Sequence, residues 1–157
     1  MMRSNTITAI DVAAYLLDEL GGMSAMRLQK LVYYTQAWHL IRHEKPMFIE
    51  NIEAWSYGPI VRELYEIHKR KFVIRREDID DKGDGSRIRQ DSDAENTIKY
   101  VTNVYGQKDG VELNELVHQE EAYIQARQHA VIDGRSNVFI SHHLMETLTH
   151  HPHPSSL

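Results

Sequence analysis

Histidine is the residue type in this sequence best suited to acid–base or metal chemistry. The chain carries ten histidines, and five of them crowd the C-terminal end: His142, His143, His150, His151 and His153. A dedicated zinc site needs ligands in a fixed geometry, supported by further hydrogen bonds. The ending HHPHPSSL is broken by prolines, and we expect residues 151–157 to form a disordered tail. We therefore predict no metal site and no cofactor, and interpret these histidines as surface or structural residues.

Carboxylates near the other histidines give no catalytic arrangement. His118 and Glu120 are two positions apart, which on a helix places them about 200° apart, so that helix alone does not pair them. The segment that begins at Asp80 superficially resembles a calcium loop, but Lys82 stands where an oxygen ligand belongs and Asp91 replaces the bidentate glutamate. The sequence also lacks a zinc-protease motif, a nucleophile elbow and a phosphate-binding glycine loop. We expect a protein that is not an enzyme.

Aromatic residues gather between positions 33 and 65, although the chain as a whole is only 8% aromatic: Tyr33, Tyr34, Trp38, Trp55, Tyr57 and Tyr65. On an extended strand, Trp55 and Tyr57 share one face, with Arg62 following shortly after. Tryptophan, tyrosine and arginine are enriched in the hot spots of protein interfaces. An open face would be a protein-binding patch, and a closed face would cover the helices. The sequence leaves both alternatives open.

We predict a partner-binding site centred on the Trp55–Pro59 stretch. Its candidate residues are Trp55, Tyr57, Gly58, Pro59, Arg62, Trp38 and His39. A second charged cluster, His68 to Lys71, ends the helix that we expect after Pro59. Such a cluster suits the negative end of a helix dipole. We interpret it as a solvated helix end, with contact to a phosphate or an acidic partner as the alternative.

The elements that position these residues are expected to be mostly helices. Thr8 caps a first helix that ends at Gly21–Gly22. Ser24 caps a second helix over about 25–43, and the short connection predicts that the two helices are antiparallel neighbours. In the second helix, four polar residues are expected to face solvent or a partner: Arg27, Lys30, Gln36 and Arg42.

The segment after the second helix contains the expected β element. Residues 52–57 alternate as a short, half-exposed strand does, and residues 86–89 are expected to pair with it. Pro59 is expected in the first turn of a third helix. Ser92 and Glu95 form an apparent capping box for a helix that stops at Gly106. Further helices are predicted from Leu113 onward and after Ser141.

Length and composition are those of one globular domain. The chain has 157 residues, 41% of them hydrophobic, with no cysteine and a net charge of −5. We predict a mainly α fold with a small antiparallel β element (α+β), as a single compact helical domain over residues 1–150. No apolar run is long enough to span a membrane, so we expect a cytoplasmic protein that does not bind membranes. The negative charge argues against binding of nucleic acid by the whole surface.

The same central segment resembles a known family. Five stretches carry the resemblance: 28–34 (LQKLVYY), 36–39 (QAWH), 45–48 (KPMF), 52–61 (IEAWSYGPIV) and 64–65 (LY). They closely resemble the signature of the Panacea domain of the SocA-like, phage-associated proteins. Weaker similarity continues through 104–106, 113–120 and 125–127. After His118 the family usually continues with a Gly-Ser-Pro-Trp-like turn, whereas this chain reads EAYI at 121–124.

The resemblance implies an antitoxin that neutralises the toxin of a two-gene module by direct protein–protein binding. It also implies a mainly helical fold with a small β element, and no enzymatic activity. One branch of the family acts as an adaptor that delivers its toxin to a protease, so a protease adaptor or chaperone-like role is the first alternative. A DNA-binding regulator is the second, supported only by the basic residues 70–76. The sequence leaves open the identity of the toxin and the oligomeric state.

Overall fold

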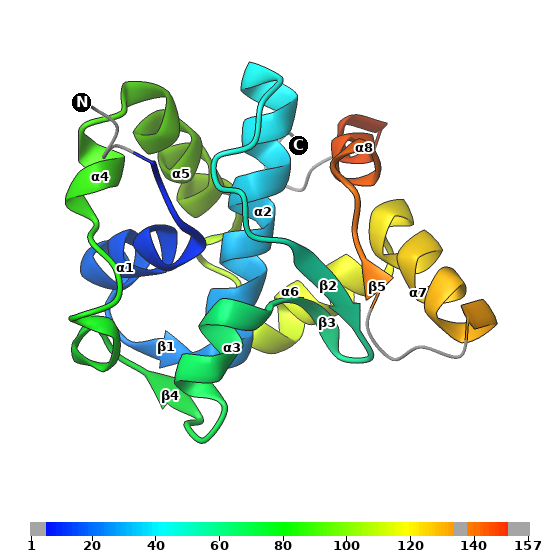
Figure 1. Ribbon diagram of the computed structural model, residues 1–157, viewed down its shortest axis with the longest axis horizontal. Coiled ribbons are helices and arrows are strands. Elements are labelled where there is room, and N and C mark those ends of the chain that lie inside the picture. Colours follow the sequence, from blue (N-terminus) through cyan, green and yellow to red (C-terminus); the bar gives the residue numbers. More distant parts are fainter. Residues whose placement is uncertain (1–5, 134–137, 151–157) are drawn as a thin grey trace.

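A single helix, α2 (Ala25–His43), forms the centre of the computed structural model, which describes residues 6–133 and 138–150. Figure 1 shows α2 upright with the other elements around it. Ser24 caps α2 by accepting a hydrogen bond from the backbone N–H of Arg27 at 3.1 Å, so the predicted cap and range are confirmed. Residues 28–37 are all buried. A helix that is buried on every side belongs to the interior of its domain.

The interior position of α2 corrects the expectation for its polar residues. Lys30 is 1% exposed and Gln36 is fully buried, whereas both were expected at the surface. The prediction assumed one covered face, but α2 has neighbours on several sides, including α5 and α6. Only Arg42 of the four is exposed.

The first helix, α1 (Ala9–Leu20), begins as predicted at Thr8. Thr8 Oγ1 accepts from Asp11 N at 3.1 Å, and Asp11 Oδ2 accepts from Thr8 N at 2.9 Å, which completes a capping box. Figure 1 shows α1 lying across α2, so the predicted antiparallel pair is wrong. The short connection forms strand β1 (Met23–Ser24), which pairs antiparallel with β4 (Val73–Ile74).

The predicted β element is a three-stranded antiparallel sheet in the order β3-β2-β5. Its strands are β2 (Ile52–Trp55), β3 (Gly58–Val61) and β5 (Val138–Phe139). Pro59 therefore lies in a strand and not in the first turn of a helix, since α3 begins later (Arg62–His68). Proline is tolerated there because β3 lies at the edge of the sheet.

The remaining elements complete a mainly helical domain. Residues 86–89 form a helical turn, α4 (Ser86–Arg89), so the strand predicted there is wrong. The cap of α5 (Ser92–Tyr105) is Asp91, not Ser92. The chain continues through α6 (Gly110–His118), α7 (Glu121–Asp133) and α8 (His142–Met145), with 3-10 helices η1 (Arg76–Ile79) and η2 (Glu146–His150). The predicted fold class is confirmed, while the tail 151–157 lies outside the described residues.

Two buried glutamines of α2 bind the backbone of the segments that follow it. Gln36 Oε1 accepts from Met47 N at 2.8 Å and Phe48 N at 3.3 Å, and its Nε2 donates to Phe48 O at 2.7 Å. Gln29 accepts from Val61 N at 2.9 Å and donates to Val61 O at 3.1 Å. A side-chain amide has the same donor and acceptor as a peptide group. Gln36 therefore satisfies backbone N–H and C=O groups of the loop, and Gln29 those of β3, as a neighbouring strand would.

The substitution Gln36→Leu tests this role. It keeps the side-chain size but leaves the buried backbone groups of Met47 and Phe48 without partners, so we expect a loss of about 2–4 kcal/mol in the free energy of unfolding. Urea denaturation measures it. Gln107→Leu, at an exposed position, is the control and should change stability by less than about 0.5 kcal/mol. Equal effects of the two substitutions would contradict the role of Gln36.

Candidate functional site

Four side chains from the β2–β3 hairpin and α3 form one partly exposed cluster, which we call the hairpin surface: Trp55, Tyr57, Arg62 and Tyr65. The Trp55 ring meets Tyr65 edge to face at 4.8 Å and Tyr57 at 5.8 Å between centroids. Arg62 lies over the indole at 5.4 Å from the ring centroid. Tyr57 is 43% exposed and the Arg62 side chain 46%. The open alternative for the Trp55 face thus describes this structure, because aromatic and cationic groups reach solvent together.

Glu53 fixes the geometry of the hairpin surface from below. Its carboxylate is buried, with 6% of the residue exposed. Oε1 accepts from Trp55 Nε1 at 2.8 Å and from Arg62 Nη2 at 3.0 Å, and Oε2 accepts from Arg62 Nε at 3.0 Å. The hydrogen bonds from Arg62 to Glu53 raise the pKa of the guanidinium above its ordinary value. One carboxylate therefore holds both the indole and the guanidinium in place.

The exposed face of the sheet continues the apolar part of this cluster. Glu53 lies opposite Ile60 on β3 and opposite Phe139 on β5. Residues directly opposite in antiparallel strands place their side chains on the same face. Phe139 is 54% exposed. The sheet therefore extends apolar surface away from Trp55 toward β5.

The turn of the hairpin rests on Lys30 of α2. Lys30 Nζ donates to Tyr57 O at 2.9 Å, and burial lowers the pKa of Lys30 to about 8. Gly58 has φ +124°, and a Cβ there would lie 2.5 Å from Lys30 Nζ, so only glycine fits. Gly58 and Pro59 are both buried. These two predicted site residues shape the turn beneath the hairpin surface.

Helix α7 holds the hairpin from another side. Tyr123 OH donates to Trp55 O, and Arg127 Nη1 donates to Ala54 O at 2.8 Å. Tyr123 belongs to the EAYI segment, where the sequence departs from the family pattern. In this chain the departing segment thus begins α7 and anchors β2 through its backbone.

Trp38 and His39 are not brought to the hairpin surface. Trp38 Nε1 donates to Tyr105 OH at 2.8 Å, and His39 Nδ1 lies 2.9 Å from Thr97 Oγ1. Both partners belong to α5, and Figure 1 shows α5 and the hairpin on opposite sides of α2. His39 is 2% exposed, and burial lowers its pKa to about 4, so the ring is neutral at physiological pH. Neither residue therefore belongs to the hairpin surface.

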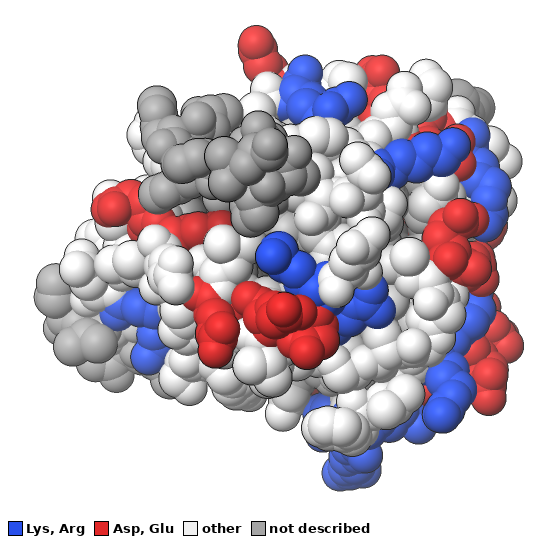
Figure 2. Space-filling view, turned by 180° about the vertical axis from the view of Figure 1, so that it is seen from behind, with Lys and Arg blue, Asp and Glu red and all other residues white. Residues whose placement is uncertain are grey.

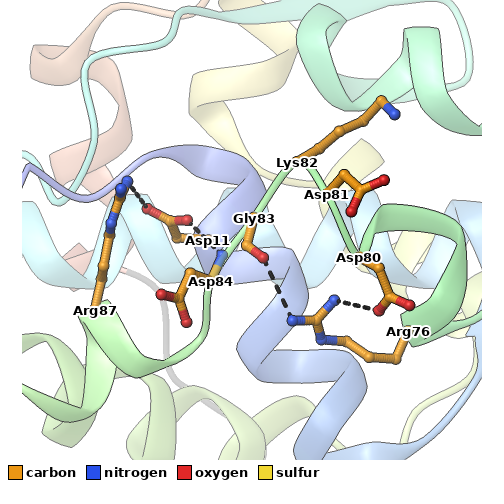
Figure 3. A pocket seen from close by; sticks show the side chains of 8 residues that line it. All are labelled: Asp11, Arg76, Asp80, Asp81, Lys82, Gly83, Asp84 and Arg87. Carbon is orange, nitrogen blue, oxygen red and sulfur yellow. Dashed lines mark hydrogen bonds and ion pairs between the residues drawn. The ribbon is translucent and has the colours of Figure 1, made fainter.

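A polar cleft of about 350 Å³ between α1 and the segment 76–87 is the second candidate (Figure 3). Its lining residues are Asp11, Arg76, Asp80, Asp81, Lys82, Gly83, Asp84 and Arg87. The buried Asp11 accepts from Asp84 N at 2.7 Å and from Arg87 Nη1 at 3.3 Å. Arg76 Nη1 donates to Asp80 Oδ1 at 3.1 Å. Residues 6–133 and 138–150 contain no group of three or more His, Asp or Glu placed to hold a metal ion.

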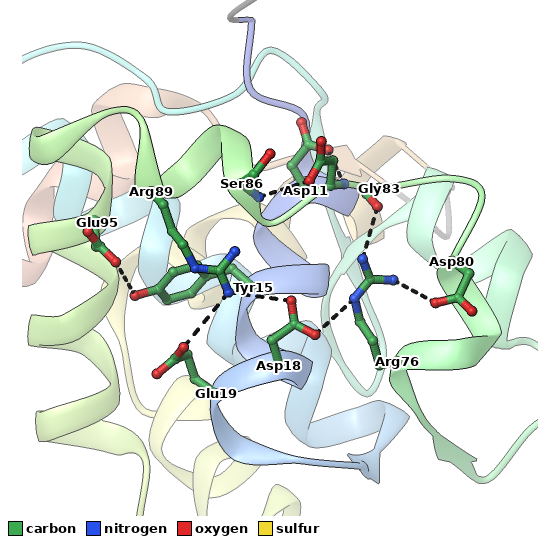
Figure 4. Close-up of polar contacts among 11 residues, drawn as sticks. Asp11, Tyr15, Asp18, Glu19, Arg76, Asp80, Gly83, Ser86, Arg89 and Glu95 are labelled. Atoms are coloured by element: carbon green, nitrogen blue, oxygen red, sulfur yellow. Dashed lines mark hydrogen bonds and ion pairs between the residues drawn. The ribbon is translucent and has the colours of Figure 1, made fainter.

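The contacts around the cleft have a structural purpose. Figure 4 shows Asp18 of α1 between two arginines, with Arg76 Nε at 3.1 Å and Arg89 Nη2 at 3.6 Å. Tyr15 OH donates to Glu95 Oε2 at 2.8 Å in the same network. These contacts fasten η1, α4 and α5 onto α1. Because Asp11, Arg76, Asp80 and Arg87 of the cleft all form ion pairs, we interpret the cleft as a structural connection between α1 and the segment 76–87.

Glu120 is a buried carboxyl group in the loop between α6 and α7. It is 6% exposed, and its Oε2 accepts from Tyr34 OH at 2.8 Å. Burial raises the pKa of Glu120 to about 8. Its Oε1 and the Tyr33 hydroxyl have no hydrogen-bond partner among the described residues. His118 is exposed and packs beside Tyr123 at 4.6 Å between ring centroids, so the two residues occupy different environments.

Charges are mixed on the face seen in Figure 2. Along its right-hand edge, which is the α1 side of Figure 1, positive and negative side chains alternate. Binding to a phosphate backbone requires a continuous patch of positive side chains. Lys and Arg form no such patch on the described part of this face. Among the described helices, none combines the length and apolar character needed to cross a bilayer.

Comparison with protein families identifies a match over the central part of the chain. The family model described as "Antitoxin SocA-like, Panacea domain" matches residues 28–123. No curated protein and no solved structure matches the chain significantly. The matched range begins within α2, includes the hairpin and α3, and ends at Tyr123, the residue that binds Trp55 O.

Sequence reasoning missed Glu53, Lys30 and Tyr65 as parts of this site. Glu53 lies two residues before Trp55 on the expected strand, and this spacing places the two side chains on one face. The burial of Lys30 could not be predicted from the sequence, because lysine side chains normally lie at the surface.

Glu53→Gln tests the arrangement. The amide keeps the shape but weakens the charge-assisted bonds to Arg62, so we expect a folded protein that is about 1–2 kcal/mol less stable. In a Trp38→Phe background, acrylamide quenching of Trp55 fluorescence should increase because the indole is released. Glu63→Gln, at an exposed neighbouring position, should change neither quantity. Unchanged quenching in Glu53→Gln would contradict the assigned role.

Glu120→Gln tests the buried carboxyl group. A glutamate in an unfolded chain ionises near pH 4.3, whereas the folded state keeps its proton up to about pH 8. The stabilisation from this group is therefore present at low pH and is lost as pH rises toward 8, by about 1.4 kcal/mol for each pH unit. Relative to Glu120→Gln, the unsubstituted protein should lose stability between about pH 5 and about pH 8.

Urea denaturation across that pH range gives the difference curve. His39 titrates in both proteins, so its contribution cancels. The exposed Glu121→Gln should keep the pH dependence of the unsubstituted chain. Parallel curves for Glu120→Gln and the unsubstituted protein would show that Glu120 is not neutral in the fold.

Proposed function

This chain belongs to the antitoxin SocA-like, Panacea domain family, and we propose that it neutralises a cognate toxin protein by binding it directly through the hairpin surface. The membership rests on the family match over residues 28–123. The observation that carries the proposal is the exposed cluster of Trp55, Tyr57, Tyr65 and Arg62 over a single buried carboxylate.

The composition of the hairpin surface supports this role. Tryptophan, tyrosine and arginine supply most of the energetically important contacts in protein interfaces. Tyr57 and the Arg62 side chain are each close to half exposed, so both offer large contact area to a partner. Phe139 adds apolar area on the same face of the sheet. A partner that covers this surface would bury several aromatic rings at once.

The rigidity of the hairpin surface supports the role further. Side chains that are ordered before binding lose less conformational entropy on association. Glu53 already holds Trp55 and Arg62, and Lys30 and Tyr123 already hold the backbone carbonyls of Tyr57 and Trp55. The chain therefore presents a preformed face to the toxin, and the toxin is inactivated because its own working surface is covered.

Tyr57→Ala is the variant that tests the proposal most cleanly, because Tyr57 is exposed and supports little of the fold. The toxin to be tested is the product of the neighbouring reading frame, purified after co-expression. We expect binding to weaken by at least about 2 kcal/mol, or roughly thirtyfold, in isothermal titration calorimetry. Trp55→Ala should weaken binding at least as much. Far-UV circular dichroism should be unchanged in Tyr57→Ala.

Phe72→Ala is the matched control, because it also removes an exposed aromatic ring but lies beyond the far end of α3. Growth rescue by co-expression should follow the affinities. Binding to Tyr57→Ala that is as tight as binding to Phe72→Ala would overturn the proposed surface. Loss of the toxin by degradation, without a stable complex, would replace direct neutralisation by delivery to a protease.

A further inference from the structure

The outer edge of β4 presents backbone groups that no described residue binds. Ser24 lies opposite Val73, and Ala25 N donates to Phe72 O at 3.1 Å. Because hydrogen-bonded and non-hydrogen-bonded pairs alternate in an antiparallel ladder, Ser24 and Val73 form a non-hydrogen-bonded pair. The N–H and C=O of Val73 therefore point away from β1. The described part of the chain supplies no third strand at this edge.

Exposed apolar side chains lie directly at this edge. Phe72 is 86% exposed, the largest value for a big apolar residue in the described part of the chain, and Val73 is 37% exposed. Met26, next to the residue that bonds Phe72, is 38% exposed. Single exposed apolar residues are ordinary at protein surfaces. Here they adjoin an unpaired strand edge, which natural proteins normally protect with charges or cover.

Two arginines flank the same edge. Arg70 and Arg75 are exposed, and neither forms an ion pair with any described residue. Their basic neighbours are paired, since Lys69 Nζ lies 2.7 Å from Glu66 Oε1 and Lys71 Nζ lies 3.5 Å from Asp78 Oδ1. We call Arg70, Phe72, Val73 and Arg75 the β4 edge. It combines an open ladder position, an apolar ring and two exposed guanidinium groups that form no ion pair with the described residues, although Arg75, first through its backbone N–H and then through its charge, lowers the pKa of the Asp78 carboxyl group.

We propose that the β4 edge binds an extended acidic segment of a protein partner, which adds to the β1–β4 ribbon as a third strand. The backbone of that segment pairs with the N–H and C=O of Val73, as in other cases of strand addition. An apolar side chain of the segment packs on Phe72. Carboxylates on either side bind Arg70 and Arg75, whose planar guanidinium groups match carboxylate geometry.

Other occupants fit these observations less well. A second copy of the chain, paired antiparallel at the same edge, would bring its arginines close to those of the first copy, and like charges repel. A membrane surface offers no strand for Val73 to pair with. The net charge of −5 also opposes attraction of the whole chain to anionic lipid.

The β4 edge is separate from the hairpin surface. Arg62 begins α3, whereas the β4 edge follows its C-terminal end. Figure 1 shows β4 at the lower left, away from the β2–β3 hairpin. The two surfaces therefore serve different contacts, and this proposal does not depend on the proposed toxin-binding function.

Fluorescence anisotropy with the full-length protein tests the proposal. The probe is a fluorescein-labelled peptide, Glu-Asp-Val-Ile-Asp-Glu, and the control peptide carries lysine at each acidic position. Val73→Pro removes the outward N–H but leaves the bonds to β1, which are made by the neighbouring residues. We expect it to weaken binding of the acidic peptide by about tenfold or more.

Val73→Thr is the matched control, because it keeps the N–H and the branched shape, and it should bind as the unsubstituted protein does. The double substitution Arg70→Glu with Arg75→Glu should abolish binding without relying on a proline. Tyr57→Ala should bind the peptide normally. Toxin binding by Val73→Pro should be unchanged, so failure of one proposal is distinguishable from failure of the other.

Three results would overturn the proposal. The first is equal binding of the acidic and basic peptides, or no binding of the acidic peptide. The second is full affinity in Val73→Pro. The third is co-sedimentation with vesicles of phosphatidylcholine and phosphatidylserine that is lost in Phe72→Ser, which would identify a lipid surface as the ligand instead.

Discussion

Buried polar side chains of α2 that bind the backbone of other segments are the interaction on which this structure depends. Gln29 binds Val61, Lys30 binds Tyr57 and Gln36 binds Met47 and Phe48, all from the interior of the domain. A buried polar group without a partner costs a few kcal/mol. Each of these side chains therefore stabilises the position in which the bound backbone segment satisfies its hydrogen bonds. α2 thereby dictates the path of the chain from the loop at Met47 to the end of the hairpin.

The candidate binding surface follows from that constraint. Lys30 fixes the turn of the hairpin and α7 fixes β2. The contacts among Glu53, Trp55 and Arg62 then form on the outer face of the sheet. The charged groups near α1 behave differently: Asp18 and Arg76 pair with each other and with their neighbours, and they join elements of the fold. The distribution of charge therefore does not by itself identify a candidate binding surface. The exposed aromatic rings over one carboxylate distinguish the hairpin surface.

Local signals were the part of the fold that sequence could predict. The caps at Thr8 and Ser24 depend on a few neighbouring residues, and both were predicted correctly. Features that depend on packing between distant parts of the chain were not predicted. These are the burial of Lys30, the strand at Pro59 and the helical turn at 86–89, which all depend on tertiary contacts. For the site, Trp55, Tyr57 and Arg62 were predicted to lie together and do. Trp38 and His39 were adjacent in the pattern, but the direction of their side chains places them against α5.

Hydroxyl-radical footprinting of the free and toxin-bound protein measures whether the toxin covers the hairpin surface. Oxidation of each side chain is read by mass spectrometry. We predict strong protection of Tyr57 and Tyr65 in the complex, with Val111, which is 63% exposed elsewhere, oxidised equally in both states. Equal oxidation of Tyr57 in the free and bound protein, with protection at other positions, would contradict the claim.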